Sequence, residues 1–181
     1  MREVRGRGSC HRYYERVPIG SIQQINISKG GIPKLPVAEA LVTPLGIQGD
    51  SHAHPQIHGG PRQALLLISW EGIDELIEAG FPLYAGALGE NITSKGLDRR
   101  SLRLGQRYRL GEVVIELTKV RSPCNTLRPY GAGIHEAIYD PQVKAKDHSS
   151  PRWGLSGLYA RVVNPGRIFV GDPIALLDEL A

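Results

Sequence analysis

The sequence predicts a mainly β protein: a closed or nearly closed β-barrel with a few short helices. Its 181 residues are 41% hydrophobic and 22% charged, a balance typical of a soluble globular domain with a sizeable core. The 22 glycines and 13 prolines predict frequent turns, and they separate short apolar runs of strand length. A single segment has the clear spacing of an amphipathic helix. These observations favour a barrel of short strands over a helical fold.

In the first half of the chain, strands are expected at residues 21–27, 37–43 and 63–69. The third run, QALLLIS, is apolar at most positions, which favours a buried strand, although periodicity alone does not separate it from a buried helix. A helix is expected at residues 70–79, capped by Ser69 and ended by Gly80. Its apolar face consists of Ile73, Leu76 and Ile77.

The second half predicts a hairpin of strands at residues 106–110 and 113–120, joined at Gly111. Apolar and polar residues alternate in the second of these strands, which suits a sheet with one wet face. Further strands are expected at residues 157–163 and 173–177. The longest stretch without a predicted element, residues 140–154, is typical of either a lid over a site or a surface insertion.

The charge distribution predicts a basic, flexible tail at residues 1–20 and one barrel domain at residues 21–181. The tail holds five arginines against two glutamates, whereas the remainder is nearly neutral. A nucleic-acid-binding protein usually carries its basic patch on the folded body, so we expect no nucleic-acid partner. No apolar run is long enough to span a membrane, and two cysteines are too few for a disulfide scaffold. We therefore expect a cytoplasmic protein with no membrane partner.

Cys124 is the first candidate for chemistry. It follows the predicted strand at residues 113–120, and Pro123 ends that strand's hydrogen-bond ladder. If residues 125–130 begin a short helix, its free N–H groups and the charge of Arg121 would lower the pKa of the thiol. A thiolate is both a nucleophile and a ligand for soft metals. The alternative is an inert buried cysteine; Cys10, in the tail, is interpreted as incidental.

Residues 49–60 are rich in groups that bind metals. Imidazole and carboxylate groups are ligands for zinc or iron, although their spacing here matches no motif with a defined geometry. The alternative is a polar loop whose histidines form hydrogen bonds. A metallohydrolase is therefore a minor hypothesis; its candidate ligands are Asp50, His52, His54 and His58.

Two glycine-containing motifs predict backbone that lies close to a ligand or to another segment. In the turn formed by His58, Gly59 and Gly60, the glycines permit successive N–H groups to point at one anion, such as a phosphate. In the run GALGENIT, two glycines precede Glu90 and Asn91. The amide of Asn91 offers both a donor and an acceptor, which suits recognition of a heterocycle edge.

These motifs occur in an order that is more specific than any one of them. The chain reads Gly49-Asp50, His58-Gly59-Gly60, Gly89-Glu90-Asn91-Ile92-Thr93, Leu104-Gly105, Arg121-Ser122-Pro123-Cys124 and Gly157-Leu158-Tyr159-Ala160-Arg161-Val162. Over residues 21–177 it resembles the MOSC family, named for the C-terminal domain of molybdenum cofactor sulfurase, in its small stand-alone bacterial form. The resemblance implies a barrel similar to the small barrel domain of pyruvate kinase.

The resemblance also implies a function connected with the molybdenum cofactor, molybdopterin. Cys124 would be the catalytic residue, either as the molybdenum ligand or as a sulfur carrier that forms a persulfide. The activity would be reduction of N-hydroxylated compounds or sulfur transfer to metal centres, with a redox or sulfur-donor protein as partner. A non-catalytic module that delivers or senses the cofactor is the alternative. The implied cofactor-binding residues are Arg121, His58, Gly59, Gly60, Glu90 and Asn91.

Pyridoxal phosphate is not expected to bind this chain alone. Larger relatives carry a pyridoxal-phosphate desulfurase domain, and no segment here offers that domain's cofactor-binding lysine in context.

Overall fold

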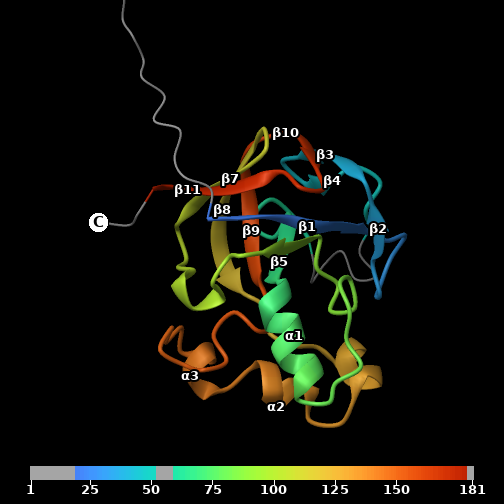
Figure 1. Cartoon of the computed structure of the whole chain (residues 1–181), viewed down its shortest axis with the longest axis vertical. Coiled ribbons are helices and arrows are strands. Elements are labelled where there is room, and N and C mark those ends of the chain that lie inside the picture. The colour runs from blue at the N-terminus through green and yellow to red at the C-terminus, as the bar shows by residue number, and fades with distance from the viewer. Residues whose placement is uncertain (1–18, 52–58, 179–181) are drawn as a thin grey trace, which may run out of the picture.

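The computed structural model describes residues 19–51 and 59–178. Within them, seven strands form a closed barrel, because β11 pairs with β1 as well as with β7 (Figure 1). Around the ring the strands are β1 (Gly20–Ile27), β6 (Ile92–Lys95), β5 (Leu65–Ser69), β9 (Leu158–Asn164), β8 (Val113–Val120), β7 (Arg107–Leu110) and β11 (Pro173–Asp178). Neighbours are antiparallel except β5 and β6. The predicted mainly β barrel is confirmed.

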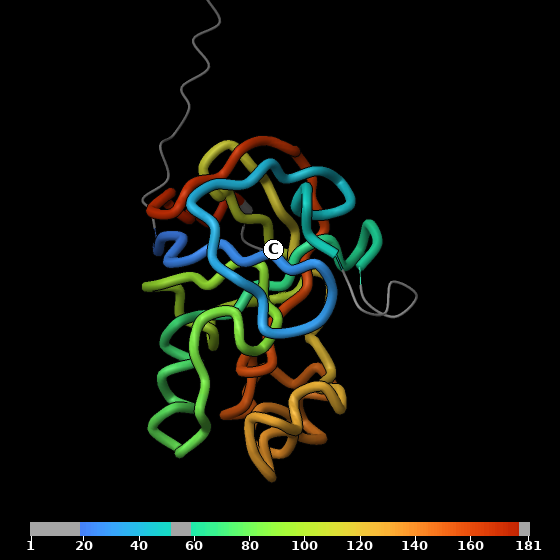
Figure 2. The backbone as a smooth tube through the Cα atoms, turned by 90° about the vertical axis from the view of Figure 1, so that its right-hand side faces the viewer, coloured from blue at the N-terminus to red at the C-terminus, as the bar shows by residue number. Residues whose placement is uncertain are grey.

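Further strands lie outside the ring. β2 (Leu35–Val37) pairs with β1, and a separate sheet contains β10 (Gly166–Phe169), β3 (Glu39–Thr43) and β4 (Gly46–Ile47). This small sheet lies at one end of the barrel, and the helices gather at the other end (Figures 1 and 2). One end of the barrel is therefore covered by a sheet and the other by helices, and the candidate site lies at the helical end.

The helices are α1 (Trp70–Glu78), α2 (Ile134–Ile138) and α3 (Pro141–Lys144), with 3-10 helices η1 (Arg99–Ser101) and η2 (Asn125–Tyr130). The predicted helix after Ser69 is confirmed as α1, and the Ser69 hydroxyl accepts a hydrogen bond from Gly72 N at 3.2 Å. In the described part of the chain, no helix has the length and apolarity needed to cross a membrane.

Most predicted strands are confirmed with small changes at their ends, and the strand at residues 113–120 matches β8. The run predicted at residues 37–43 is divided between β2 and β3 by a bend at Ala38. β6 and β10 were not predicted, because their sequences read as a glycine motif and as a turn. Residues 1–18 and 179–181 lie outside the description, so the predicted flexible tail remains a prediction.

Residues 140–154 contain more structure than their sequence predicts. Asp140 caps α3 by accepting a hydrogen bond from Val143 N at 2.7 Å, and turns follow as far as residue 156. Val143 and Trp153 are buried in the same apolar cluster as the barrel interior. The segment is therefore packed against the body, which favours the surface-insertion interpretation over a lid.

Two apolar clusters lie on opposite faces of β5. Leu65 and Leu67 point into the barrel with residues from all the other ring strands. Leu66 and Ile68 point outward, into a second cluster with α1, η2 and α2. A strand buried on both faces must be apolar at successive positions, which explains the run QALLLIS. Leu66, Leu88 and Tyr159 of the outer cluster also line the candidate site.

Candidate functional site

Cys124 is held at the junction between β8 and η2. After β8 ends, Arg121 N still donates to Gly157 O at 3.0 Å, and the chain then turns away through Pro123. Cys124 has extended backbone angles and precedes η2, so residues 125–130 do form a short helix, of the 3-10 type. Its carbonyl accepts a hydrogen bond from Nε2 of His135, on α2, at 2.9 Å. Contacts on both sides therefore fix the backbone that carries the thiol.

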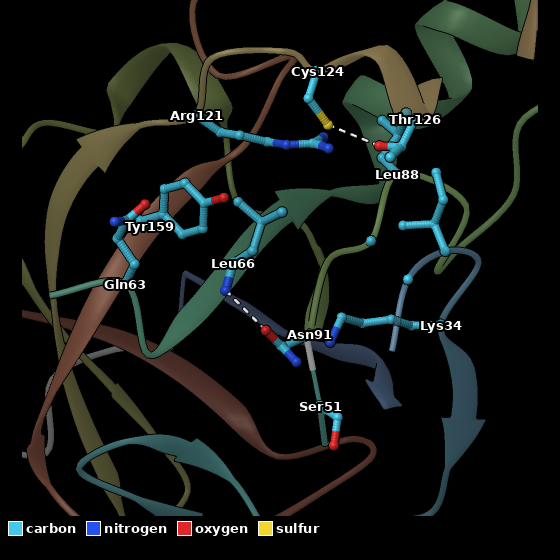
Figure 3. Close-up of a pocket in the computed structure, with 13 residues that line it drawn as sticks. Lys34, Ser51, Gln63, Leu66, Leu88, Asn91, Arg121, Cys124, Thr126 and Tyr159 are labelled. Atoms are coloured by element: carbon cyan, nitrogen blue, oxygen red, sulfur yellow. Dashed lines mark hydrogen bonds between the residues drawn. The ribbon is translucent and has the colours of Figure 1, made fainter. Parts of the chain in front are cut away.

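The surroundings of the thiol favour its ionised form. Sγ of Cys124 lies 2.8 Å from Oγ1 of Thr126, and the Arg121 guanidinium points toward the sulfur (Figure 3). Partial burial raises the pKa of the Cys124 thiol, but hydrogen bonds from Thr126 and the charge of Arg121 outweigh this, so the pKa lies below its usual value. Cys124 is half-buried, so the sulfur combines a lowered pKa with access to a ligand.

Arg121 is a buried cation beside the thiol. It is 4% exposed, and its Nη1 has no hydrogen-bond partner among the described residues. Tyr159, from β9, lies on the opposite side of the guanidinium from Cys124 (Figure 3). Burial raises the pKa of Tyr159, and the charge of Arg121 opposes that rise. A buried donor without a partner is costly, so this atom is suited to an anionic or acceptor group of a ligand.

A cavity of about 70 Å³ opens beside the sulfur, against the outward face of β5. Sequence reasoning did not identify most of its walls, which come from segments far apart in the chain. They consist of Gly31, Ile32, Lys34, Ser51, Gln63, Leu66, Leu88, Gly89, Asn91, Arg121, Cys124, Thr126 and Tyr159. The cavity is thus enclosed by the barrel wall, the loop after β1, the loop before β6 and the start of η2 (Figure 3).

Lys34, Asp50 and Asn91 form a buried polar network in one wall. Lys34 and Asp50 form an ion pair with both side chains nearly inaccessible. Asn91 Nδ2 donates to Asp50 Oδ2 at 2.8 Å, and Asn91 Oδ1 accepts from Leu66 N at 3.2 Å. The amide of Asn91 is therefore satisfied within the protein, where it joins the wall to β5. The hydrogen bonds that the structure shows for Asn91 hold the cavity wall in place. Its role in binding a cofactor remains a prediction.

Glu90 lies behind the cavity wall and is not among the lining residues. Its Oε1 accepts from Gly86 N at 2.5 Å and from Thr93 Oγ1 at 3.0 Å, while Oε2 has no hydrogen-bond partner in the described part of the chain. Complete burial raises the pKa of Glu90, and these hydrogen bonds and the charge of Arg121 oppose the rise only in part. Its implied role in cofactor binding is untested by this arrangement.

The histidine-rich segment is only partly described. His52, His54 and His58 lie outside the described residues, so the minor metallohydrolase hypothesis stays untested for them. Gly59 and Gly60 have φ values of 94° and 85°, a conformation that glycine tolerates best, but neither lines the cavity. Residues 19–51 and 59–178 contain no group of three metal-binding side chains, and Asp50 is engaged by Lys34.

Comparison with known proteins places this chain in a family. Residues 54–175 match the model of the MOSC domain. The chain belongs to the MOSC family. It is 30% identical to the YiiM protein of Escherichia coli, over 94% of this chain and 74% of that protein. It is also 30% identical to the uncharacterized YflK protein of Bacillus subtilis, over 82% of this chain and 64% of that protein.

A third relative is a reductase of Gibberella moniliformis, 28% identical over 74% of this chain but only 23% of that longer protein. Among solved structures, YiiM from Geobacillus stearothermophilus has a TM-score of 0.62 and 27% identity, covering 88% of this chain and 75% of that one. YiiM from Escherichia coli has a TM-score of 0.60 and 25% identity, covering 91% and 72%. The barrel is therefore of the MOSC type, and membership of the family supports a molybdenum-cofactor-related role, of the sulfur-transfer or reductase type.

Proposed function

We propose that this MOSC protein binds the molybdenum cofactor through Cys124 and reduces N-hydroxylated compounds. One observation carries the proposal: a reachable thiol of lowered pKa lies beside a buried arginine whose Nη1 has no hydrogen-bond partner within residues 19–51 and 59–178. Ordinary structural cysteines are inert and need no such cation. The cytoplasm keeps thiols reduced, so a reactive free thiol fits a cytoplasmic protein, which is the location we propose.

The residues at the cavity fit the metal-bearing end of this cofactor. A thiolate is a soft ligand of the kind that suits a soft metal site, and Arg121 Nη1 supplies an unused donor for an anionic group. When bound, the cofactor would supply two-electron redox chemistry at molybdenum.

The protein's own residues would hold, orient and shield the reacting end. The Thr126 hydroxyl would donate to the thiolate and fix its direction, and the charge of Arg121 also lowers the pKa of the thiol. Since Lys34 is already paired with Asp50, Arg121 supplies the positive charge that remains for a ligand. Leu66 and Leu88 provide apolar walls, which exclude water and strengthen these electrostatic contacts.

A sulfur carrier that forms a persulfide on Cys124 is the alternative reaction, because the same accessible thiolate serves both. Either activity needs a redox or sulfur-donor protein as partner. A cofactor-delivery module is the non-catalytic alternative, in which the cofactor binds but no substrate is turned over.

The test is expression in a host that makes the cofactor, followed by molybdenum and pterin analysis of the wild type, Cys124→Ser and Cys10→Ser. We expect near-stoichiometric molybdenum in the wild type and Cys10→Ser, its loss in Cys124→Ser, and turnover of an amidoxime with reduced methyl viologen. A persulfide on Cys124 without molybdenum would instead identify the sulfur carrier, and molybdenum without turnover the delivery module. Negligible molybdenum together with an unmodified Cys124 would contradict all three.

A further inference from the structure

The small sheet of β10, β3 and β4 has two different sides. Ala40, Val42 and Ile168 point inward, where they are buried in the same apolar cluster as the barrel interior. Because successive side chains of a strand lie on opposite faces, the residues between them point outward. This outward side is here called the end face. It consists of Glu39, Leu41, Arg167 and Phe169, with Leu45 and Val170 in the turns at its two ends.

Exposed apolar side chains are concentrated on the end face. Eight large apolar side chains are exposed over residues 19–51 and 59–178, and half of them are Leu41, Leu45, Phe169 and Val170. Leu45 is 68% exposed and Phe169 is 44% exposed. Single exposed apolar residues are normal on a protein surface, whereas several on one small sheet indicate an interaction surface.

The edge of β10 is closed to another strand. Its pairing with β3 occupies one side of the strand. On the other side, Arg167 N donates to Glu112 Oε2 at 3.0 Å and Phe169 N donates to Asp172 Oδ2 at 2.8 Å. Because carboxylates already occupy these backbone donors, a partner cannot extend the sheet at this edge. A partner would therefore contact the side chains of the end face.

The charges of the end face are balanced. Within β3 and β10 the charged residues are Glu39 and Arg167, both about half exposed, with Arg167 Nη1 at 3.6 Å from Glu39 Oε2. One charge of each sign gives no net attraction for a nucleic acid or for a strongly acidic or basic protein. A two-fold axis places a face against itself, so such a face is self-complementary. Glu39 of each copy can then meet Arg167 of the other.

We propose that the end face joins two copies of this chain in a symmetric dimer. Leu41 and Phe169 form the apolar centre of the interface, and the reciprocal pairs of Glu39 with Arg167 fix its register. The candidate site lies at the other, helical end of the barrel, so both Cys124 cavities stay open in the dimer (Figures 1 and 2). The strands are short, so we expect an interface below roughly 1,200 Å² in total and a dimer that dissociates on dilution.

Sedimentation velocity of the full-length protein over a range of concentrations tests the proposal. We expect the mass of one chain at low concentration and of two at high concentration. The double variant Leu41→Thr, Phe169→Thr keeps residues that favour strands, and it should weaken the association at least tenfold. The matched control Ile19→Thr, Ile77→Gln removes two similarly exposed apolar side chains outside the end face. It should change the association less than twofold.

Charge reversal tests the two-fold arrangement itself. Glu39→Arg alone, or Arg167→Glu alone, places like charges against each other across the axis and should weaken self-association at least tenfold. An equimolar mixture of these two variants should associate as the wild type does, because each chain then meets opposite charges on the other. Urea unfolding shows that each variant is folded, and a purely structural defect would not recover on mixing.

A wild type that stays monomeric at every concentration would overturn the proposal, as it would if residues 1–18 of the same chain covered the end face. Equal losses in the two apolar double variants would overturn it too, and so would folded charge variants that fail to associate when mixed. Cys124→Ser should dimerise as the wild type does. The outcome is therefore independent of whether Cys124 binds molybdenum.

Discussion

At the scale of single residues, the reactivity of Cys124 depends on opposing effects within one short segment. Removal from water disfavours the thiolate, whereas hydrogen bonds from Thr126 and the charge of Arg121 favour it, and the favourable effects prevail. Arg121 is itself buried, so its field is screened less than that of a surface arginine. Because these effects oppose one another, the loss of one hydrogen-bond donor should change the pKa of the Cys124 thiol.

Replacing Thr126 with Ala should raise the pKa of the Cys124 thiol, because it removes the hydroxyl donor and leaves the burial unchanged. A hydrogen bond to a charged group contributes about 1.5 kcal/mol or more, so alkylation at neutral pH should slow by roughly tenfold. The pH profile of iodoacetamide alkylation, recorded on a Cys10→Ser background, measures this. The half-maximal rate should move to higher pH, since the thiolate forms only above the pKa.

Thr126→Ser is the matched control, since it keeps the hydroxyl and loses only a methyl group. Its profile should follow the wild type. Identical profiles for the Ala and Ser variants would show that Thr126 does not set the thiol's reactivity.

At the scale of elements, the two faces of β5 contribute to different parts of the molecule: one packs inside the barrel and the other lines the site. Leu67 and Leu66 are adjacent and both buried, yet the first packs inside the barrel and the second lines the cavity at Cys124. Truncation of either should destabilise the fold by about 2–5 kcal/mol, the usual cost of a buried Leu→Ala change. The truncation of Leu66 would enlarge the cavity at Cys124, whereas the truncation of Leu67 would leave a space inside the barrel.

We therefore expect Leu66→Ala, but not Leu67→Ala, to increase the rate at which a bulky maleimide modifies Cys124. Urea unfolding gives the stability of each variant, and modification is measured on a Cys10→Ser background where both variants remain folded. Leu67→Ala is the control for loss of stability alone. Equal acceleration in both variants would mean that opening of the fold, rather than cavity shape, controls access to the thiol.

Sequence patterns predicted the helices and strands that have a characteristic spacing or cap of their own. They missed strands that form only because a neighbouring strand pairs with them. β8 alternates and α1 has a cap and an apolar face, so each could be predicted. β6 has the sequence ITSK, whose buried threonine and serine give no strand pattern of their own. It is a strand because α1 returns the chain so that β6 pairs in parallel with β5.

At the scale of the whole molecule, the site is an assembly of distant segments, and this sets what the sequence could predict. Cys124 and Arg121 are close in the chain, so their pairing was foreseeable. Lys34 and Tyr159 were not, because only the closed barrel brings them to the same cavity. The glycines of GALGENIT predicted a close backbone approach without naming the neighbour. The neighbour is the backbone at Lys34, whose N–H donates to Gly86 O at 2.9 Å.

Gly86 is the point at which two of these segments meet. A Cβ there would overlap the carbonyl oxygen of Lys34, and the residue has a φ of 93°. Gly80, at the end of α1, has a similar φ of 95°, but a Cβ there would meet nothing within 4 Å. Alanine at either position takes on a conformation that costs roughly 1–2 kcal/mol. The difference between the two variants therefore isolates the close contact.

We expect Gly86→Ala to lower the free energy of unfolding by about 2 kcal/mol more than Gly80→Ala does, since overpacking typically costs about 1–3 kcal/mol. Urea denaturation of both variants measures the difference. Gly86→Ala should also alter the rate of Cys124 alkylation, because relief of the overlap displaces the segment that carries Lys34 in the cavity wall. Gly80→Ala, where a Cβ would meet nothing within 4 Å, should leave the rate unchanged. Equal destabilisation by the two alanines, with wild-type alkylation rates in both, would show that the approach at Gly86 does not hold the cavity together.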